Sequence, residues 1–237
     1  MILVLSTAQS LYWLGRIAVR IDNLCHLLPF EDDEAARSYA HAFALPAWSA
    51  DTLNQLLLDP DQTVSLPGNL QHLFENVQQV RGVILEQTYQ AFNALQQTDI
   101  EPEPAFIDRK RSANQTVSSP AEDLISAQAE APRELSLQLN PDIRLRLAQC
   151  MDVMREEDDR VQLFWKLGQI IESVDIALRV QSTPLTAIQG LADILDELEA
   201  LGWRGLDAAF HHFQQRPGLT GLYQLCDLLD ELFEDGP

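Results

Sequence analysis

Two leucine-rich segments carry charged residues at matching positions. Residues 11–22 read LYWLGRIAVRID and residues 163–175 read LFWKLGQIIESVD, and they align when Lys166 is treated as an insertion. Each segment has an aromatic residue before a Trp, then Leu-Gly, and each ends on an Asp. This pattern predicts an internal repeat of one helix. Arginine and carboxylate side chains on such helices can form bidentate salt bridges, and a guanidinium can also bind a carboxylate or a phosphate.

A glycine lies at the same position of each segment, Gly15 in the first and Gly168 in the second. Glycine inside a helix costs about 1 kcal/mol relative to alanine, so two at matching positions indicate a packing requirement. We expect these glycines to let the two helices cross with their backbones in contact. The polar residues of both helices would then lie near a shared centre.

The other residue types that often carry chemistry form no complete set in this sequence. There is no HExxH, no CxxC, no P-loop, no GxGxxG and no GxSxG pattern. We therefore expect no catalytic residue, no metal and no cofactor, with the histidines at the surface or in the core and the acidic run on a solvated face. The histidines are His26, His41, His72, His211 and His212, and the acidic run is Asp152, Glu156, Glu157, Asp158 and Asp159.

The composition narrows the class of protein further. Among 237 residues, 16 are Lys or Arg and 36 are Asp or Glu, a net charge of −20. That balance excludes a basic nucleic-acid binder and argues against anionic membrane surfaces. The three cysteines are far apart, the N-terminus lacks a signal-peptide pattern, and no apolar run is long enough to span a membrane. We expect a soluble cytoplasmic protein that favours basic partner surfaces.

Apolar residues recur at three- and four-residue steps through most of the chain, which predicts an all-α multi-helix bundle. We expect a capping box at Ser6, a helix start at Thr183-Pro184, and a helix end at Gly202. The acidic C-terminal helix would either dock in a basic groove or, as we expect, pack on its own bundle. The predicted helices cover about 6–28, 31–45, 49–58, 67–97, 141–181 with a possible break at 156–160, 184–201, 204–215 and 219–234.

Proline and serine set one stretch apart. Residues 99–141 hold five prolines and few large apolar residues, which predicts a linker or mobile excursion. We therefore expect an N-terminal helical half at 1–98 and a C-terminal helical half at 142–237 that packs on the first.

The two segments resemble the motifs of the alpha-E family, a predicted all-helical domain with a Glu-Arg (ER) motif. In the first copy, residues 10–16 fit the start of the motif and Arg20 falls on the motif arginine. Val19 replaces the motif glutamate, and Asp22 takes the place of the trailing Glu. In the second copy Phe164, Leu167, Gly168 and Glu172 fit, whereas Gln169 and Ser173 replace two arginines.

A further block resembles another motif of the same family. Residues 56–61 fit its start, and Glu75, Asn76 and Arg81 fit positions further on, while Phe74 replaces an arginine. The resemblance covers about residues 5–95 and 142–180. Since each ER pair keeps one member, we predict that Arg20 and Glu172 contact each other, directly or through water.

Two alternatives stay open for these charged residues. On a helical wheel Arg20 lies opposite the apolar stripe of residues 11–28, which favours a solvated position unless another helix or a partner covers that face. Arg16, Arg20 and Arg81, which keep family positions, could instead form a carboxylate or phosphate site.

The resemblance implies a partner, because the family is associated with circularly permuted ATP-grasp ligases and transglutaminase-like peptidases. It favours a non-catalytic accessory subunit that positions a peptide or amino-acid substrate for such a ligase. The alternatives are a diverged scaffold with a dead ancestral site and a stand-alone enzyme with an Arg/Glu cleft. The candidate substrate- or partner-binding residues are Arg16, Arg20, Arg81, Glu172, Asp22, Asp175, Glu75 and Asn76.

Overall fold

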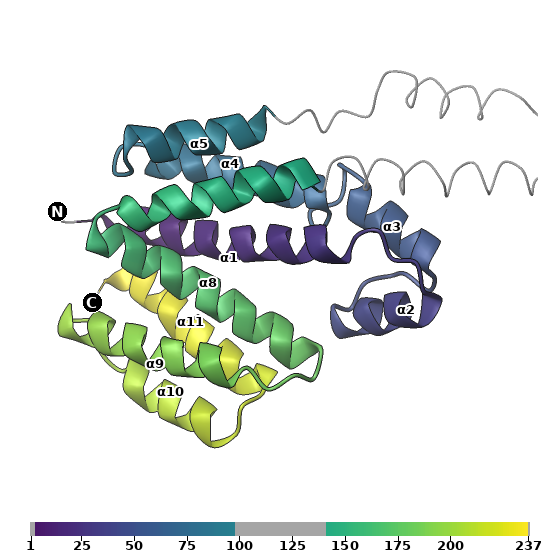
Figure 1. The fold of residues 1–237 in the computed structure, drawn as a ribbon. Coiled ribbons are helices and arrows are strands. Elements are labelled where there is room, and N and C mark those ends of the chain that lie inside the picture. Colours follow the sequence, from purple (N-terminus) through teal and green to yellow (C-terminus); the bar gives the residue numbers. More distant parts are fainter. Residues whose placement is uncertain (1–2, 98–140, 237) are drawn as a thin grey trace, which may run out of the picture. The chain divides into compact units, whose positions relative to one another are not determined.

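The computed structural model describes residues 3–97 and 141–236 (Figure 1). Every regular element in these two ranges is a helix, which confirms the all-α prediction. The proline-rich segment predicted at 99–141 lies outside the described residues except for Pro141. None of the described helices is both long enough and apolar enough to cross a membrane.

The helices follow the predicted order closely. In the first described range they are α1 (Leu5–Leu27), α2 (Asp33–Ala42), α3 (Ala50–Leu58), α4 (Leu66–Val80) and α5 (Glu86–Gln96). The second range begins with helical residues 141–153, followed by the short 3₁₀ helix η1 (Met154–Glu156). It continues with α8 (Asp159–Arg179), α9 (Leu185–Ala200), α10 (Leu206–Gln215) and α11 (Leu219–Asp235).

Some of the predicted helix ends agree with the structure and others do not. Ser49 caps α3 in a capping box with Thr52. At the end of α9, Gly202 adopts a φ of 100° and the Trp203 amide donates to the Leu198 carbonyl at 3.0 Å, as predicted for a glycine after a helix. The capping box at Ser6 was wrong, because α1 already begins at Leu5 and Ser6 lies in its first turn.

The cap predicted at Thr183 was wrong as well. Pro184 occupies the N-cap position of α9, and no side chain caps this helix end. Proline therefore stands one position earlier than the preference for proline at the first helical residue suggests.

The helix predicted over 67–97 is two helices. Residues 81–85 form a turn between α4 and α5, although Ile84 stays buried, so the apolar pattern continues across the interruption. The amide of Leu85 donates to Oε1 of the buried Glu157 at 2.8 Å, which satisfies the start of α5 with a side chain 72 residues away. Because this hydrogen bond comes from so far along the chain, the turn between α4 and α5 could not be predicted from the spacing of apolar residues in 67–97.

The chain divides into two compact units. Among the described residues, the first unit combines 3–20, 72–89 and 151–236, and the second combines 21–71, 90–97 and 141–150. In the first unit α8 packs on α9, α9 on α10, α10 on α11, and α11 on α8, so the four helices close on one another (Figure 1). Leu222, Leu225 and Leu229 on α11 are fully buried, so the acidic C-terminal helix packs on its own bundle.

In the second unit, side chains form hydrogen bonds to backbone groups of neighbouring segments. Asn54 on α3 accepts from the Phe30 amide at 2.9 Å and donates to the Phe30 carbonyl at 2.9 Å. Asp33 at the start of α2 accepts from the Ala50 amide at the start of α3 at 2.8 Å. The loop between α1 and α2 and the first turns of α2 and α3 are thereby fixed to one another.

Candidate functional site

The candidate site begins with a backbone crossing between α1 and α8. A Cβ built on Gly15 would overlap the carbonyl oxygen of Trp165 and come within 3.0 Å of the Gln169 amide. A Cβ on Gly168 would overlap the Tyr12 carbonyl oxygen and come within 3.0 Å of the Arg16 amide. The two glycines therefore make reciprocal contacts, as the sequence predicted. The internal repeat itself stays a prediction.

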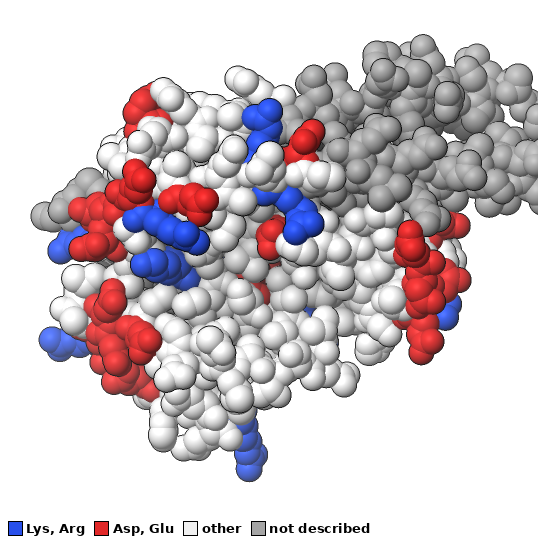
Figure 2. Space-filling view, viewed as in Figure 1, with Lys and Arg blue, Asp and Glu red and all other residues white. Residues whose placement is uncertain are grey.

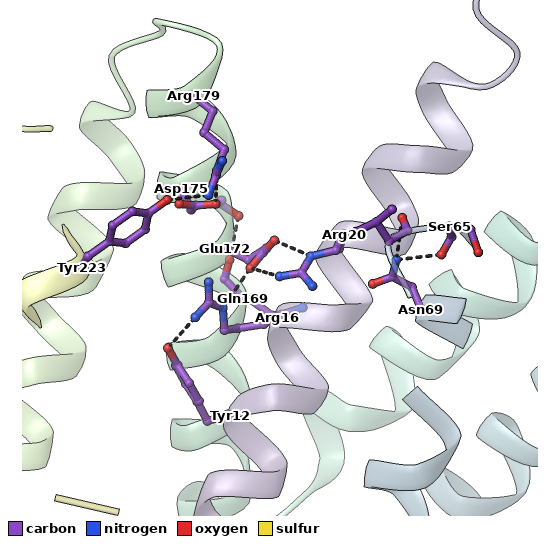
Figure 3. A network of polar contacts seen from close by, with 12 residues as sticks. Tyr12, Arg16, Arg20, Ser65, Asn69, Gln169, Glu172, Asp175, Arg179 and Tyr223 are labelled. Carbon is purple, nitrogen blue, oxygen red and sulfur yellow. Dashed lines mark hydrogen bonds and ion pairs between the residues drawn. The ribbon is translucent and has the colours of Figure 1, made fainter. Parts of the chain in front are cut away.

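One turn further along each helix, the crossing brings a carboxylate between two arginines (Figure 3). Arg20 donates through Nε to Oε1 and through Nη2 to Oε2 of Glu172, at 2.8 and 2.9 Å. Arg16 donates through Nε to Oε2 at 2.8 Å. The predicted contact of Arg20 with Glu172 is confirmed as a bidentate ion pair. We call Arg16, Arg20 and Glu172 the clamp.

Burial differs sharply among the three members of the clamp. The side chain of Glu172 is 2% exposed and that of Arg16 is 11% exposed, whereas that of Arg20 is 37% exposed. The solvated alternative therefore does not hold for the pair, because α8 covers the face of α1 opposite its leucine stripe. The helical-wheel argument failed because α1 packs on more than one side.

Aromatic residues of α1 position Arg16. Its Nη1 donates to the Tyr12 hydroxyl at 3.0 Å, and its guanidinium lies 5.0 Å from the centroid of the Trp13 ring. Tyr12 in turn contacts Phe233 on α11, with ring centroids 5.4 Å apart. Arg16 is thus held by groups ahead of it on its own helix and by Glu172 on α8, which leaves little freedom for its side chain.

The electrostatics of the clamp keep Glu172 ionised. Burial alone would raise the pKa of Glu172, but the charges and hydrogen bonds of Arg20 and then Arg16 outweigh it and hold that pKa below its ordinary value. Tyr12 behaves in the opposite way, because burial raises the pKa of its hydroxyl despite the nearby Arg16. At neutral pH the clamp contains one carboxylate and two guanidinium groups.

The cysteines of the chain are buried and neutral. Burial raises the pKa of the Cys25 and Cys150 thiols to about 12. Burial also raises the pKa of Cys226, whose Sγ lies 4.0 Å from the Tyr12 hydroxyl. Because the thiolate is the reactive form, these thiols are not activated nucleophiles.

A second polar group lies on the same helix as Glu172, less than one turn further on. Asp175 accepts from Nε of Arg179 at 2.8 Å, and Nη2 of Arg179 donates to the hydroxyl of Tyr223 on α11 (Figure 3). We call Asp175, Arg179 and Tyr223 the α8–α11 cluster. It lies in the same compact unit as the clamp.

The structure brings some of the predicted site residues together and leaves others apart. Arg16, Arg20 and Glu172 form the clamp, and Asp175 belongs to the adjoining cluster. Arg81 is exposed at the end of α4, and among the described residues no hydrogen bond or ion pair joins it to Glu172. The remaining three are Glu75, exposed on α4; Asn76, whose amide donates to the His72 carbonyl; and Asp22, which lies in the second unit beside His26.

Sequence reasoning missed the parts of the site that depend on α11. Tyr223 was not considered, and no local pattern could have indicated it, because its register against α8 is set by packing. Arg179 was detectable in principle, since it follows Asp175 by four residues, the spacing of a helical ion pair. Tyr12 was noted only as part of a motif.

Other features of the described residues add little chemistry. A depression of about 90 Å³ lies beside η1 and α8, with Met154, Trp165 and Lys166 in its lining. No group of three or more His, Cys, Asp or Glu side chains in the described ranges is arranged to hold a metal ion. Acidic side chains gather in several groups on the surface, with fewer basic ones between them (Figure 2).

Comparison with known families identifies the class of protein. The model of the alpha-E family, described as a predicted alpha-helical domain with a conserved ER motif, matches residues 4–206. The chain belongs to this family. The match continues past residue 183, beyond the motifs recognised in the sequence. Comparison with curated proteins gave no match, and comparison with solved structures gave none either.

Proposed function

We propose that this protein is a non-catalytic helical accessory subunit that acts with an ATP-grasp-type ligase in peptide synthesis or modification and helps to position the substrate. The observation that supports a binding role is the clamp: its carboxylate accepts three charge-assisted hydrogen bonds from two arginines. The identity of the partner follows from the resemblance to the alpha-E motifs.

The clamp is suited to holding rather than to proton transfer. A general acid or base needs an oxygen that can exchange a proton with the substrate. Both oxygens of Glu172 are occupied, and the two arginines keep the carboxylate ionised. A transglutaminase-like partner is a second possibility for the same accessory role.

Arg20 is the member of the clamp that a partner or substrate would reach. Its side chain is 37% exposed, and its Nη1 has no hydrogen-bond partner among the described residues. A guanidinium fixed on one edge presents its other edge to a carboxylate or phosphate with little loss of side-chain entropy. We therefore assign Arg20 as the contact and Arg16 with Glu172 as its support.

The reciprocal glycine contact favours a second candidate, a scaffold in which the clamp only fastens α1 to α8. The two functions differ in what Arg20 does. In the accessory subunit Arg20→Ala weakens the activity of the partner, whereas in the scaffold it alters stability alone.

The test is affinity capture of the tagged protein from its native cells at moderate salt, followed by an assay of the captured ligase. We expect stoichiometric recovery of an ATP-grasp-type ligase, and lower ligation activity with Arg20→Ala than with wild type. Arg204→Ala is the matched control, because Arg204 is an exposed arginine of the same unit. Recovery of no ligase or peptidase contradicts the proposal, and equal activity of both variants favours the scaffold.

A further inference from the structure

The loop between α2 and α3 presents a tryptophan to solvent. Trp48 is 69% exposed, whereas Trp165 is buried. The loop reads Phe-Ala-Leu-Pro-Ala-Trp over residues 43–48, without a charge, and Ala44 and Pro46 are exposed together with Trp48. A single exposed leucine is ordinary on a protein surface, but the large apolar ring system of tryptophan is usually well buried. An exposed indole in an uncharged loop therefore indicates a surface that another molecule covers.

Hydrogen bonds fix the backbone of this loop. The Leu45 amide donates to the Ala40 carbonyl at 2.8 Å, and the Trp48 amide donates to Oγ1 of Thr52 on α3 at 3.1 Å. Ala44 adopts a φ of 53°, in the left-handed region that alanine rarely occupies. A residue stays in that region only where the surrounding structure holds it there. Trp48 is therefore presented from a defined position, and its binding to a partner costs little backbone entropy.

Carboxylates lie close to the same loop. Oδ1 of Asp33 accepts from the Ala50 amide at 2.8 Å, so the acidic first turn of α2 lies beside the chain two residues after Trp48. Figure 2 shows acidic side chains gathered where Figure 1 draws α2 and α3. We call residues 43–48 and the exposed carboxylates near them the Trp48 surface. These carboxylates are Glu31, Asp32, Asp33, Glu34 and Asp51, and residues 31–51 contain one arginine, Arg37.

The chemistry of the Trp48 surface selects its occupant. Tryptophan side chains in protein interfaces fill apolar pockets of the partner and are among the residues that contribute most to affinity. Charges around such an anchor are matched by opposite charges on the partner, so the carboxylates require lysine and arginine. A second copy of this chain would bring carboxylates against carboxylates in a two-fold contact. Nucleic acids and anionic membranes carry phosphates, which the same carboxylates repel.

We propose that the Trp48 surface docks a protein partner whose apolar pocket, ringed by lysine and arginine side chains, takes the indole of Trp48. Trp48 is the anchor of this contact, and the carboxylates steer and orient the partner. The Trp48 surface belongs to the second unit and the clamp to the first, so the docking is independent of the clamp and goes beyond the proposed accessory function.

The test is photo-crosslinking of the full-length protein in its native cells. Trp48→p-benzoylphenylalanine should give one dominant adduct, and mass spectrometry of the crosslinked peptide should locate the attachment in an apolar pocket of another protein, ringed by lysine and arginine. Leu185→p-benzoylphenylalanine is the matched control, because Leu185 is 71% exposed in the first unit and should give no adduct with that protein. If the Trp48 variant does not fold, Pro46→p-benzoylphenylalanine replaces it at an exposed position of the same loop.

The charge of the partner is tested in the same assay. Glu34→Gln combined with Asp51→Asn, added to the crosslinking variant, should lower the adduct yield about threefold or more, because each exposed ion pair adds a small favourable contribution. Asp193→Asn combined with Glu197→Gln removes the same charge from the exposed side of α9 in the first unit and should leave the yield unchanged.

Three results would overturn the proposal. They are the absence of an adduct at position 48, an adduct within this chain or with a second copy of it, and attachment to a surface without basic side chains. Equal yields from the two neutralised pairs of carboxylates would overturn it as well.

The proposed function is scored separately, from the identity of the crosslinked protein and from the ligase capture described above. Capture of a ligase without an adduct at position 48 removes this inference and keeps the accessory function. An adduct of the stated chemistry with a protein other than a ligase keeps the Trp48 surface and counts against the accessory function.

Discussion

The clamp in the first unit and the Asn54 contact in the second each join two segments of the chain through a buried polar side chain, but one side chain is charged and the other is neutral. Asn54 is buried and neutral. Its side-chain oxygen accepts from the Phe30 amide, and its side-chain nitrogen donates to the Phe30 carbonyl. Glu172 is buried and charged, and it needs two arginines, one of which stays partly exposed. A neutral amide is enough to fix a segment of chain. The clamp differs from the Asn54 contact in that one of its charged groups, Arg20, still reaches solvent.

Removal of the clamp carboxylate should have the largest effect. Glu172→Ala leaves Arg16 buried without its counter-ion, and breaking a buried ion pair in this way costs about 3–5 kcal/mol of unfolding free energy. Urea unfolding monitored by circular dichroism measures the change. Glu197→Ala, which removes an exposed carboxylate from α9, should stay within about 0.5 kcal/mol of wild type. A small effect of Glu172→Ala would mean that the clamp does not stabilise the first unit.

A methyl group at the crossing should have the next largest effect. Gly168→Ala places Cβ against the backbone carbonyl of Tyr12, which cannot move aside as a flexible side chain can. Overpacking of this kind costs about 1–3 kcal/mol, and here we expect the upper part of that range. Gly82→Ala is the matched control, because a Cβ there meets nothing within 4 Å. Equal thermal midpoints for the two variants would show that the helices separate easily.

Removal of the neutral Asn54 contact should have a moderate effect on stability. Asn54→Ala leaves the amide and carbonyl of Phe30 without their partner, at a cost of about 1–3 kcal/mol. Gln55→Ala, an exposed change on the same helix, should be nearly neutral. Because Asn54 is uncharged, the effect of Asn54→Ala should not depend on salt. A strong salt dependence would contradict the contrast drawn between the two contacts.

Acid should weaken the clamp and spare the Asn54 contact. The pKa of Glu172 is lower in the folded state than its ordinary value of 4.5, so its contribution to stability is fully present above that value. The contribution is lost as the pH falls through the folded-state pKa. The stability difference between wild type and Glu172→Gln should therefore shrink as the pH is lowered below about 4.5, whereas that of Asn54→Ala should stay constant. Equal pH profiles of the two differences would disprove this assignment.

Arg20→Ala should have the smallest effect on stability, because its side chain is more than a third exposed and solvent screens its ion pair. We expect a loss of about 1 kcal/mol or less in urea unfolding. Arg16→Ala, at a more buried position, should cost clearly more. If the order is reversed, Arg20 is the structural member of the clamp, and the assignment of Arg20 as the partner contact fails.

Much of the fold followed from local patterns, because the helices in the described ranges carry regular apolar stripes. The glycine crossing and the Arg20–Glu172 pair were also predictable, the first from matching positions and the second from the family motif. The turn at residues 81–85 was not, because it depends on a hydrogen bond from Glu157 that lies far away in the chain. The position of Tyr223 depends on how α11 packs against α8, and periodicity within one helix carries no information on that.

The clamp joins side chains that are 156 residues apart in the chain. During synthesis α1 therefore leaves the ribosome long before α8 exists, and Arg16 is then without its partner Glu172. The clamp can form only after the whole stretch between the two helices has been made, and contacts of such long range slow folding. Until α8 arrives, the first helix is a segment that chaperones would bind and that aggregation would threaten.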